Sequence, residues 1–125
     1  MAKQRITVQG LSVRINKDDY VSLTDIAKQS NSKPSVFISS WLKNSNTILF
    51  LETWESIYNS DFKVHQMVEF KILAMDNRNV ISPKNYIEIA SGVGITSQAG
   101  RHSGTYAHRN IALEFCGWLN PAFKV

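Results

Sequence analysis

The residues best suited to chemistry lie in one glycine-rich stretch, residues 94–106. Within this stretch Gly100 and Gly104 flank Arg101, which is the only formally charged residue over 89–108. Because glycine has no side chain, the backbone beside it can turn tightly and approach another molecule closely. An arginine guanidinium binds phosphate oxygens and guanine edges. We therefore expect a glycine-tipped hairpin whose polar tip contacts an anionic partner.

A second group of polar side chains recurs one helical turn apart, at Ser35, Ser39 and Lys43. Pro34 precedes them and suits the first position of a helix, where its missing N–H would have no partner in any case. The opposite face of the same segment is apolar and consists of Phe37, Ile38, Trp41 and Leu42. We therefore expect an amphipathic helix with one face in the core and a polar face that is free to bind.

Neither a metal site nor a nucleotide site is supported by the spacing of candidate ligands. His102, His108 and Cys116 are the side chains that could form a metal site, but neither their spacing nor their number matches a known zinc pattern. The glycine-rich stretch also lacks the Gly-Lys-Ser/Thr ending of a phosphate-binding loop. The sequence therefore predicts no metal and no cofactor.

Cleavage of a phosphodiester would need carboxylates that hold a divalent metal ion, with a lysine nearby, so that water is activated. The candidate carboxylates are Asp61 and Glu69, and the candidate lysine is Lys71. Glu69 and Lys71 fall on a helical pattern rather than a strand pattern, and they lie in an acidic part of the chain. No Ser-His-Asp grouping can be argued from the sequence. The residues therefore predict a binding domain that is not an enzyme.

The distribution of charge indicates the kind of partner. Lys and Arg number 14 against 10 Asp and Glu, which gives a net charge of +4. Seven cations and three anions fall in residues 1–43, two and five in 44–76, and five and two in 77–125. Residues 26–51 and 89–113 contain no carboxylate, as a surface that faces phosphates would require. Both candidate binding segments lie in these two stretches.

Length and composition predict a single domain over residues 1–125, because a chain of this size can bury one core. No run approaches the roughly 20 apolar residues that a membrane span needs. The N-terminus lacks the apolar segment of a signal peptide. The one cysteine, Cys116, fits a reducing compartment, so we expect a soluble cytoplasmic domain. Residues 122–125 have the pattern of a new element, which predicts a domain truncated at its C-terminus.

The elements that position these residues begin with strands. Short alternating runs over 6–8, 11–15 and 20–23 predict a three-stranded antiparallel meander. Ser22 and Asp25 then fit a capping box, which predicts a short helix to about Ser30.

Helical spacing continues in the middle of the chain. A helix over 47–58 is predicted by Ile48, Leu51, Trp54 and Tyr58, and one over 64–76 by Val64, Met67, Val68, Ile72 and Met75. Ser82 and Pro83 read as the N-cap and first turn of a helix that Gly92 closes. A last helix follows the glycine-rich stretch and stops at Asn120-Pro121.

Several strings of residues resemble the KilA-N domain of phages and mobile elements. They are Tyr20-Val21-Ser22-Leu23-Thr24-Asp25-Ile26-Ala27, Trp41-Leu42, Thr47-Ile48-Leu49-Phe50-Leu51 with Trp54-Glu55, and Gly100-Arg101-x-x-Gly104-Thr105-Tyr106-Ala107-His108-x-x-Ile111-Ala112 with Trp118-Leu119-x-Pro121-x-Phe123. The strings follow the family's order over nearly the whole chain. KilA-N domains are in turn similar to the APSES DNA-binding domains of fungal transcription factors, in which a glycine-rich wing precedes a helix.

The resemblance implies an α+β fold with a winged helix-turn-helix-like core, N-terminal antiparallel strands, a glycine-rich wing hairpin and several amphipathic helices. It also implies that this chain is the DNA-binding domain of a regulatory protein of a phage or mobile element. Its expected partner is double-stranded DNA, and its expected location is the cytoplasm of a bacterial host or phage-infected cell. Carried over to this chain, it places the DNA contacts on the second helix and the wing, at Lys33, Ser35, Ser39, Lys43, Gln98, Gly100, Arg101, His102, Ser103 and Gly104.

A second function class stays open. The acidic amphipathic helices expected over 47–58 and 64–76 could serve a protein-interaction or dimerisation domain, in a homo-oligomer or with a basic protein partner. Chromatography separates the two classes, because the two surfaces carry opposite charge. A basic DNA-binding surface would be retained on heparin, whereas an acidic interaction surface would be retained on an anion exchanger.

Overall fold

The computed structural model describes residues 5–8, 10–30, 33–100 and 103–119. Its helices are α1 (Leu23–Ser30), α2 (Pro34–Lys43), α3 (Ser45–Tyr58), α4 (Val64–Met75), α5 (Pro83–Ala90) and α6 (Arg109–Leu119). Its strands are β1 (Arg5–Val8), β2 (Leu11–Arg14), β3 (Val21–Ser22), β4 (Ile95–Gln98) and β5 (Gly104–Ala107). The predicted α+β class is therefore confirmed. None of the described helices is long and apolar enough to cross a membrane.

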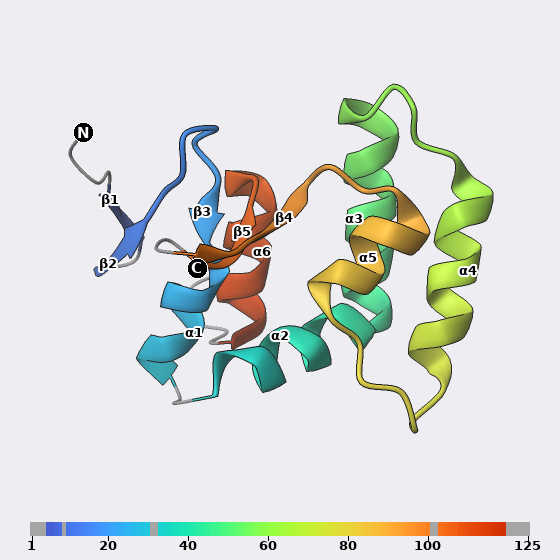
Figure 1. The fold of residues 1–125 in the computed structure, drawn as a ribbon, viewed down its shortest axis with the longest axis horizontal. Coiled ribbons are helices and arrows are strands. Elements are labelled where there is room, and N and C mark those ends of the chain that lie inside the picture. The colour runs from blue at the N-terminus through green and yellow to red at the C-terminus, as the bar shows by residue number, and fades with distance from the viewer. Residues whose placement is uncertain (1–4, 9, 31–32, 101–102, 120–125) are drawn as a thin grey trace.

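Helix α2 is the central element of the fold. It packs against α1, α3, α4, α5 and α6. Figure 1 shows α3, α4 and α5 on one side of it, with α1, α6 and the strands on the other. Trp41 of α2 is fully buried, and its ring meets that of Phe115 edge-on at 5.0 Å between centroids. One face of α2 therefore joins the two halves of the core, as its apolar pattern predicts.

The described strands form two small sheets rather than one three-stranded meander. Strand β1 pairs with β2, whereas β3 pairs with β5 and β5 with β4, all antiparallel. An isolated bridge from Ile15 to Val21 links the two sheets. The predicted meander is wrong at β3, because an alternating pattern shows that a segment is extended but not which strand it pairs with.

Local signals placed most helix starts correctly. Ser22 Oγ accepts a hydrogen bond from the Asp25 N–H at 3.0 Å, as the start of α1 requires. Ser82 and Asn85 form a capping box at the start of α5. Helix α3 begins earlier than predicted, because the Asn44 side chain caps it by accepting from the Asn46 and Thr47 N–H groups.

The helix predicted over 64–76 is confirmed as α4, but most of the apolar residues that predicted it do not face the core. Met67, Phe70 and Ala74 face the core. Of the residues that predicted the helix, Met67 is buried, whereas Val64, Val68, Ile72 and Met75 are 46% to 79% exposed. Helix α4 therefore carries two apolar stripes, and periodicity alone does not say which of them meets the rest of the protein.

A buried carboxylate joins α3 to α5 and to the segment that leads into β4. Glu55 is fully buried, and its Oε2 accepts hydrogen bonds from the Tyr86 hydroxyl at 2.7 Å, the Val93 N–H at 3.0 Å and the Gly94 N–H at 2.9 Å. Its Oε1 accepts from Asn59 Nδ2 at 3.0 Å. Buried charged groups need such partners because desolvation is costly. The two backbone N–H donors fix where the β4–β5 hairpin leaves the helical half.

The end of α5 differs from the prediction in one residue. Ser91, rather than Gly92, takes the left-handed conformation that closes the helix, with φ of 55°. Gly92 is needed for space, because a Cβ there would overlap the Tyr86 ring and approach Oε2 of Glu55.

Candidate nucleic-acid interface

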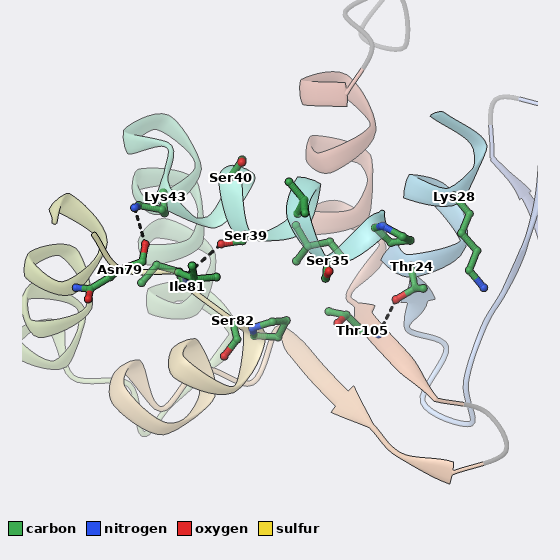
Figure 2. A pocket seen from close by; sticks show the side chains of 15 residues that line it. Thr24, Lys28, Ser35, Ser39, Ser40, Lys43, Asn79, Ile81, Ser82 and Thr105 are labelled. Carbon is green, nitrogen blue, oxygen red and sulfur yellow. Dashed lines mark hydrogen bonds between the residues drawn. The ribbon is translucent and has the colours of Figure 1, made fainter. Parts of the chain in front are cut away.

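A groove of about 680 Å³ lies between α2, the segment before α5, and the place where α1 meets β5 (Figure 2). Its lining residues are Thr24, Lys28, Pro34, Ser35, Val36, Ile38, Ser39, Ser40, Lys43, Asn79, Val80, Ile81, Ser82, Pro83 and Thr105. Six of these residues are serine or threonine, two are lysine and none is a carboxylate. The groove therefore offers hydroxyl donors and positive charge to an anionic partner.

The start of α2 forms one exposed edge of the groove. Lys33 and Ser35 are exposed, in agreement with the binding face predicted for this helix. Pro34 occupies the first turn, and no side chain caps the helix at Lys33. A helix N-terminus carries partial positive charge and favours a nearby anion.

Further along α2, Ser39 and Lys43 are occupied within the protein. Lys43 Nζ donates to the carbonyl of Asp76 at 3.2 Å and to that of Asn79 at 2.8 Å. Ser39 Oγ accepts from the Ile81 N–H at 3.1 Å. Figure 2 shows these side chains reaching across the groove. The expectation of a free polar face is therefore wrong at these two positions, which hold segment 76–81 against α2.

The predicted glycine hairpin is present as β4 and β5. Gln98 is half-buried at the end of β4 and pairs with Gly104 at the start of β5. Gly100 is exposed with φ of +88°, and its carbonyl accepts from the Ser103 N–H at 3.1 Å. These bonds bring the two ends of the turn together, and the predicted contacts Arg101 and His102 lie outside the described residues.

The groove and the hairpin meet at Thr105. This residue is buried, lines the groove and follows Gly104 in β5. Its N–H donates to Thr24 Oγ1 of α1 at 3.0 Å. The predicted binding segments of α2 and the hairpin are thus parts of one continuous region, although they are more than 50 residues apart in the chain.

Two residues of this region were missed by sequence reasoning. Lys28 is exposed on the last turn of α1 and lines the groove. It lies within the stretch that has no carboxylate, and this signal could have identified it. Ser40 is also exposed on the groove side of α2.

Three of the residues considered for catalysis or metal binding, His108, Cys116 and Lys71, are buried or paired within the protein, and His102 lies outside the described residues. His108 caps α6, because its Nδ1 accepts from the Asn110 N–H at 3.1 Å. Burial and, secondarily, the charge of Arg109 lower the pKa of His108. Cys116 is buried, which raises the pKa of its thiol to about 11. Lys71 Nζ on α4 pairs with Glu52 of α3 at 3.3 Å. Within the described ranges, no three His, Cys, Asp or Glu side chains gather as a metal site would require.

Comparison with known proteins relates almost the whole chain to one family. The sequence profile of the KilA-N domain matches residues 4–125. Protein kilA of Escherichia phage P1 is 48% identical over 31 residues, which are 25% of this chain and 12% of the phage protein. The chain therefore matches only a small part of that relative. No solved structure matches it.

Proposed function

The chain belongs to the KilA-N family, and on this basis we propose that it is a phage-type domain that binds duplex DNA through the start of α2 and the β4–β5 hairpin. In this proposal α1 and α2 act as the helix-turn-helix and the hairpin acts as the wing. The observation that supports it most is the groove, which is lined by the exposed Lys28 and several hydroxyls and by no carboxylate. A cytoplasmic location and a regulatory role go with this proposal.

The chemistry of the region suits the DNA backbone. Lysine side chains, serine hydroxyls and the N-terminus of a helix are among the groups that bind phosphate oxygens. Lys28 and Lys33 supply lysine side chains and Ser35 supplies a hydroxyl. The helix N-terminus is that of α2, which begins at Pro34. Val36 is 55% exposed beside them and could touch a thymine methyl group. We propose no catalytic step for this site, because binding alone accounts for these groups.

Binding should depend strongly on salt. With three or four phosphates neutralised, the logarithm of the binding constant is expected to fall against the logarithm of salt concentration with a slope of roughly −3 to −4. Fluorescence anisotropy of a labelled duplex across a salt series measures this slope. Lys28→Gln should make the slope less steep by about 1, whereas Lys63→Gln, an exposed lysine outside the groove, should not change it. A flat salt response in the parent protein contradicts the proposal.

The second candidate function, self-association, is favoured by the outer stripe of α4. Val64, Val68, Ile72 and Met75 are exposed along one helix face. Contiguous exposed apolar residues commonly mark an interaction surface. We propose dimerisation through this stripe as a function that is separate from the groove.

This candidate predicts a dimer in solution that a change on α4 dissociates. Analytical ultracentrifugation of the parent at about 100 μM, roughly a hundredfold above a micromolar dissociation constant, should show the dimer. Val68→Glu combined with Ile72→Glu should give a monomer. Leu113→Glu, at an exposed leucine of α6, should leave the dimer intact. A monomeric parent at this concentration rules out the candidate.

A further inference from the structure

Three side chains from β2 and α1 hold the end of the glycine turn. Arg14 Nη2 donates to the Ser103 carbonyl at 3.3 Å. Thr24 Oγ1 accepts from the Thr105 N–H at 3.0 Å. Asp25 binds both the side chain and the backbone of Arg14. We call Arg14, Thr24 and Asp25 the α1 anchor.

The ion pair at the centre of the α1 anchor has a fixed geometry. Arg14 Nε donates to Asp25 Oδ2 and Nη2 donates to Oδ1, each at 2.9 Å. The Arg14 backbone N–H also donates to Oδ2 at 2.9 Å. Burial opposes the charged form of Asp25, but these bonds outweigh it and hold the pKa of the carboxyl below its ordinary value. Paired, two-point bonds of this kind set orientation as well as position.

The turn fits closely against the α1 anchor. Gly104 has φ of +147°, a conformation that favours glycine. A Cβ at this position would lie 3.2 Å from Thr24 Oγ1 and 3.5 Å from Arg14 Nη2. The backbone of the hairpin therefore lies close to the two side chains, and the positive φ together with the tight approach to Thr24 favours glycine at this position.

Arg14 itself is directed inward. Its side chain is 14% exposed, and its guanidinium lies 5.8 Å from the centre of the Tyr106 ring. Although it is a cation close to the turn, its charge is already balanced by Asp25. This geometry suits a residue that orients a neighbour better than one that contacts phosphate.

We infer that Arg14 and Thr24 are positioning residues for DNA binding, which fix Ser103 and Thr105 at the start of β5 relative to α1 and α2, so that the hairpin and α2 reach one duplex together. The inference rests on the proposed function. Arg14 acts through Ser103 and Asp25, and Thr24 through Thr105. Without these bonds the start of β5 would have to be ordered when DNA binds, and ordering one residue costs roughly tenfold in a binding constant.

The test combines DNA affinity, salt slope and stability in Arg14→Lys and Thr24→Val, measured well below the melting temperature. Both variants should bind DNA roughly tenfold more weakly than the parent, with an unchanged salt slope because no phosphate contact is removed. Thr24→Ser keeps the hydroxyl and should restore affinity. Arg78→Lys is the matched control, because it changes a guanidinium that pairs with Asp76 far from the turn. It should bind as the parent does.

Amide hydrogen exchange supplies a readout that does not need DNA. The Thr105 N–H should exchange faster in Thr24→Val than in the parent and in Thr24→Ser, because its acceptor is removed. A parent that binds DNA, with both anchor variants binding equally well, overturns the inference and leaves the proposed function standing. Arg14→Gln, which removes the charge, supplies the test of direct contact: a salt slope less steep by about 1 in this variant also overturns the inference, since Arg14 would then be a phosphate contact. A parent that does not bind DNA overturns both.

Discussion

Replacing Glu55 by glutamine is expected to lower the free energy of unfolding by about 3 kcal/mol. The carboxylate accepts from the Tyr86 hydroxyl, from two backbone N–H groups and from Asn59 Nδ2, and it is fully buried. Glutamine has the same shape but presents an NH₂ group to a donor at one of its two ends. At least one buried donor then loses its acceptor, and leaving such a group unpaired is costly.

Thermal and urea denaturation measure this effect, which should lower the melting temperature by roughly 10 °C. Glu52→Gln is the matched control on the same helix, since Glu52 pairs with the half-exposed Lys71 at 3.3 Å. Partly exposed ion pairs contribute at most about 1 kcal/mol. Equal stability losses in the two variants would show that the buried network does not hold α3, α5 and the hairpin together.

Replacing Arg101 by alanine is expected to weaken DNA binding by about 1–3 kcal/mol if the side chain reads a base edge. The expectation rests on sequence, because Arg101 is the only formally charged residue over 89–108 and lies between two glycines. If the contact is to phosphate, the salt slope should become less steep by about 1 and all sequences should lose affinity alike. The two outcomes distinguish base readout from positioning on the backbone.

Melting temperature and binding should respond differently in this variant. Surface substitutions usually change stability by no more than about 0.5 kcal/mol, so Arg101→Ala should melt close to the parent. Arg109→Ala, at an exposed arginine of α6, is the control and should retain affinity. Unchanged affinity and slope in Arg101→Ala, with clear binding by the parent, would mean that the glycine stretch is only a turn and that other elements contact DNA.

The features that sequence reasoning placed correctly are local ones. The Ser22 cap, Pro34 at the start of α2 and the Ser82 cap each depend on residues within about four positions, so a short pattern carries the whole signal. The α+β class follows from such signals. The exposure of Lys33 and Ser35 at the start of α2 also agrees with a local pattern.

The features that sequence reasoning missed depend on distant partners. Ser39 meets Ile81 42 positions away, and Arg14 meets Ser103 89 positions away. A polar side chain on a helix face looks the same in sequence whether solvent, DNA or another segment faces it. This is why Ser39 was expected on a free surface and why Arg14 was not singled out. The pairing of β3 with β5 was missed for the same reason.

Segment 76–81 is held against α2 by Ser39 and Lys43, so in the proposed complex it limits how many base pairs this helix can contact. The start of α2 that carries the proposed contacts, residues 33–36, spans about 6 Å at 1.5 Å per residue. Successive base pairs are about 3.4 Å apart, so this length faces about two of them. A site of two specified base pairs recurs by chance about once in every 16 positions. Both affinity and the frequency of such sites decide whether a protein finds its target. If α2 binds DNA as proposed, specific recognition of one site therefore needs further contacts from the hairpin, from a second copy or from further parts of a longer chain.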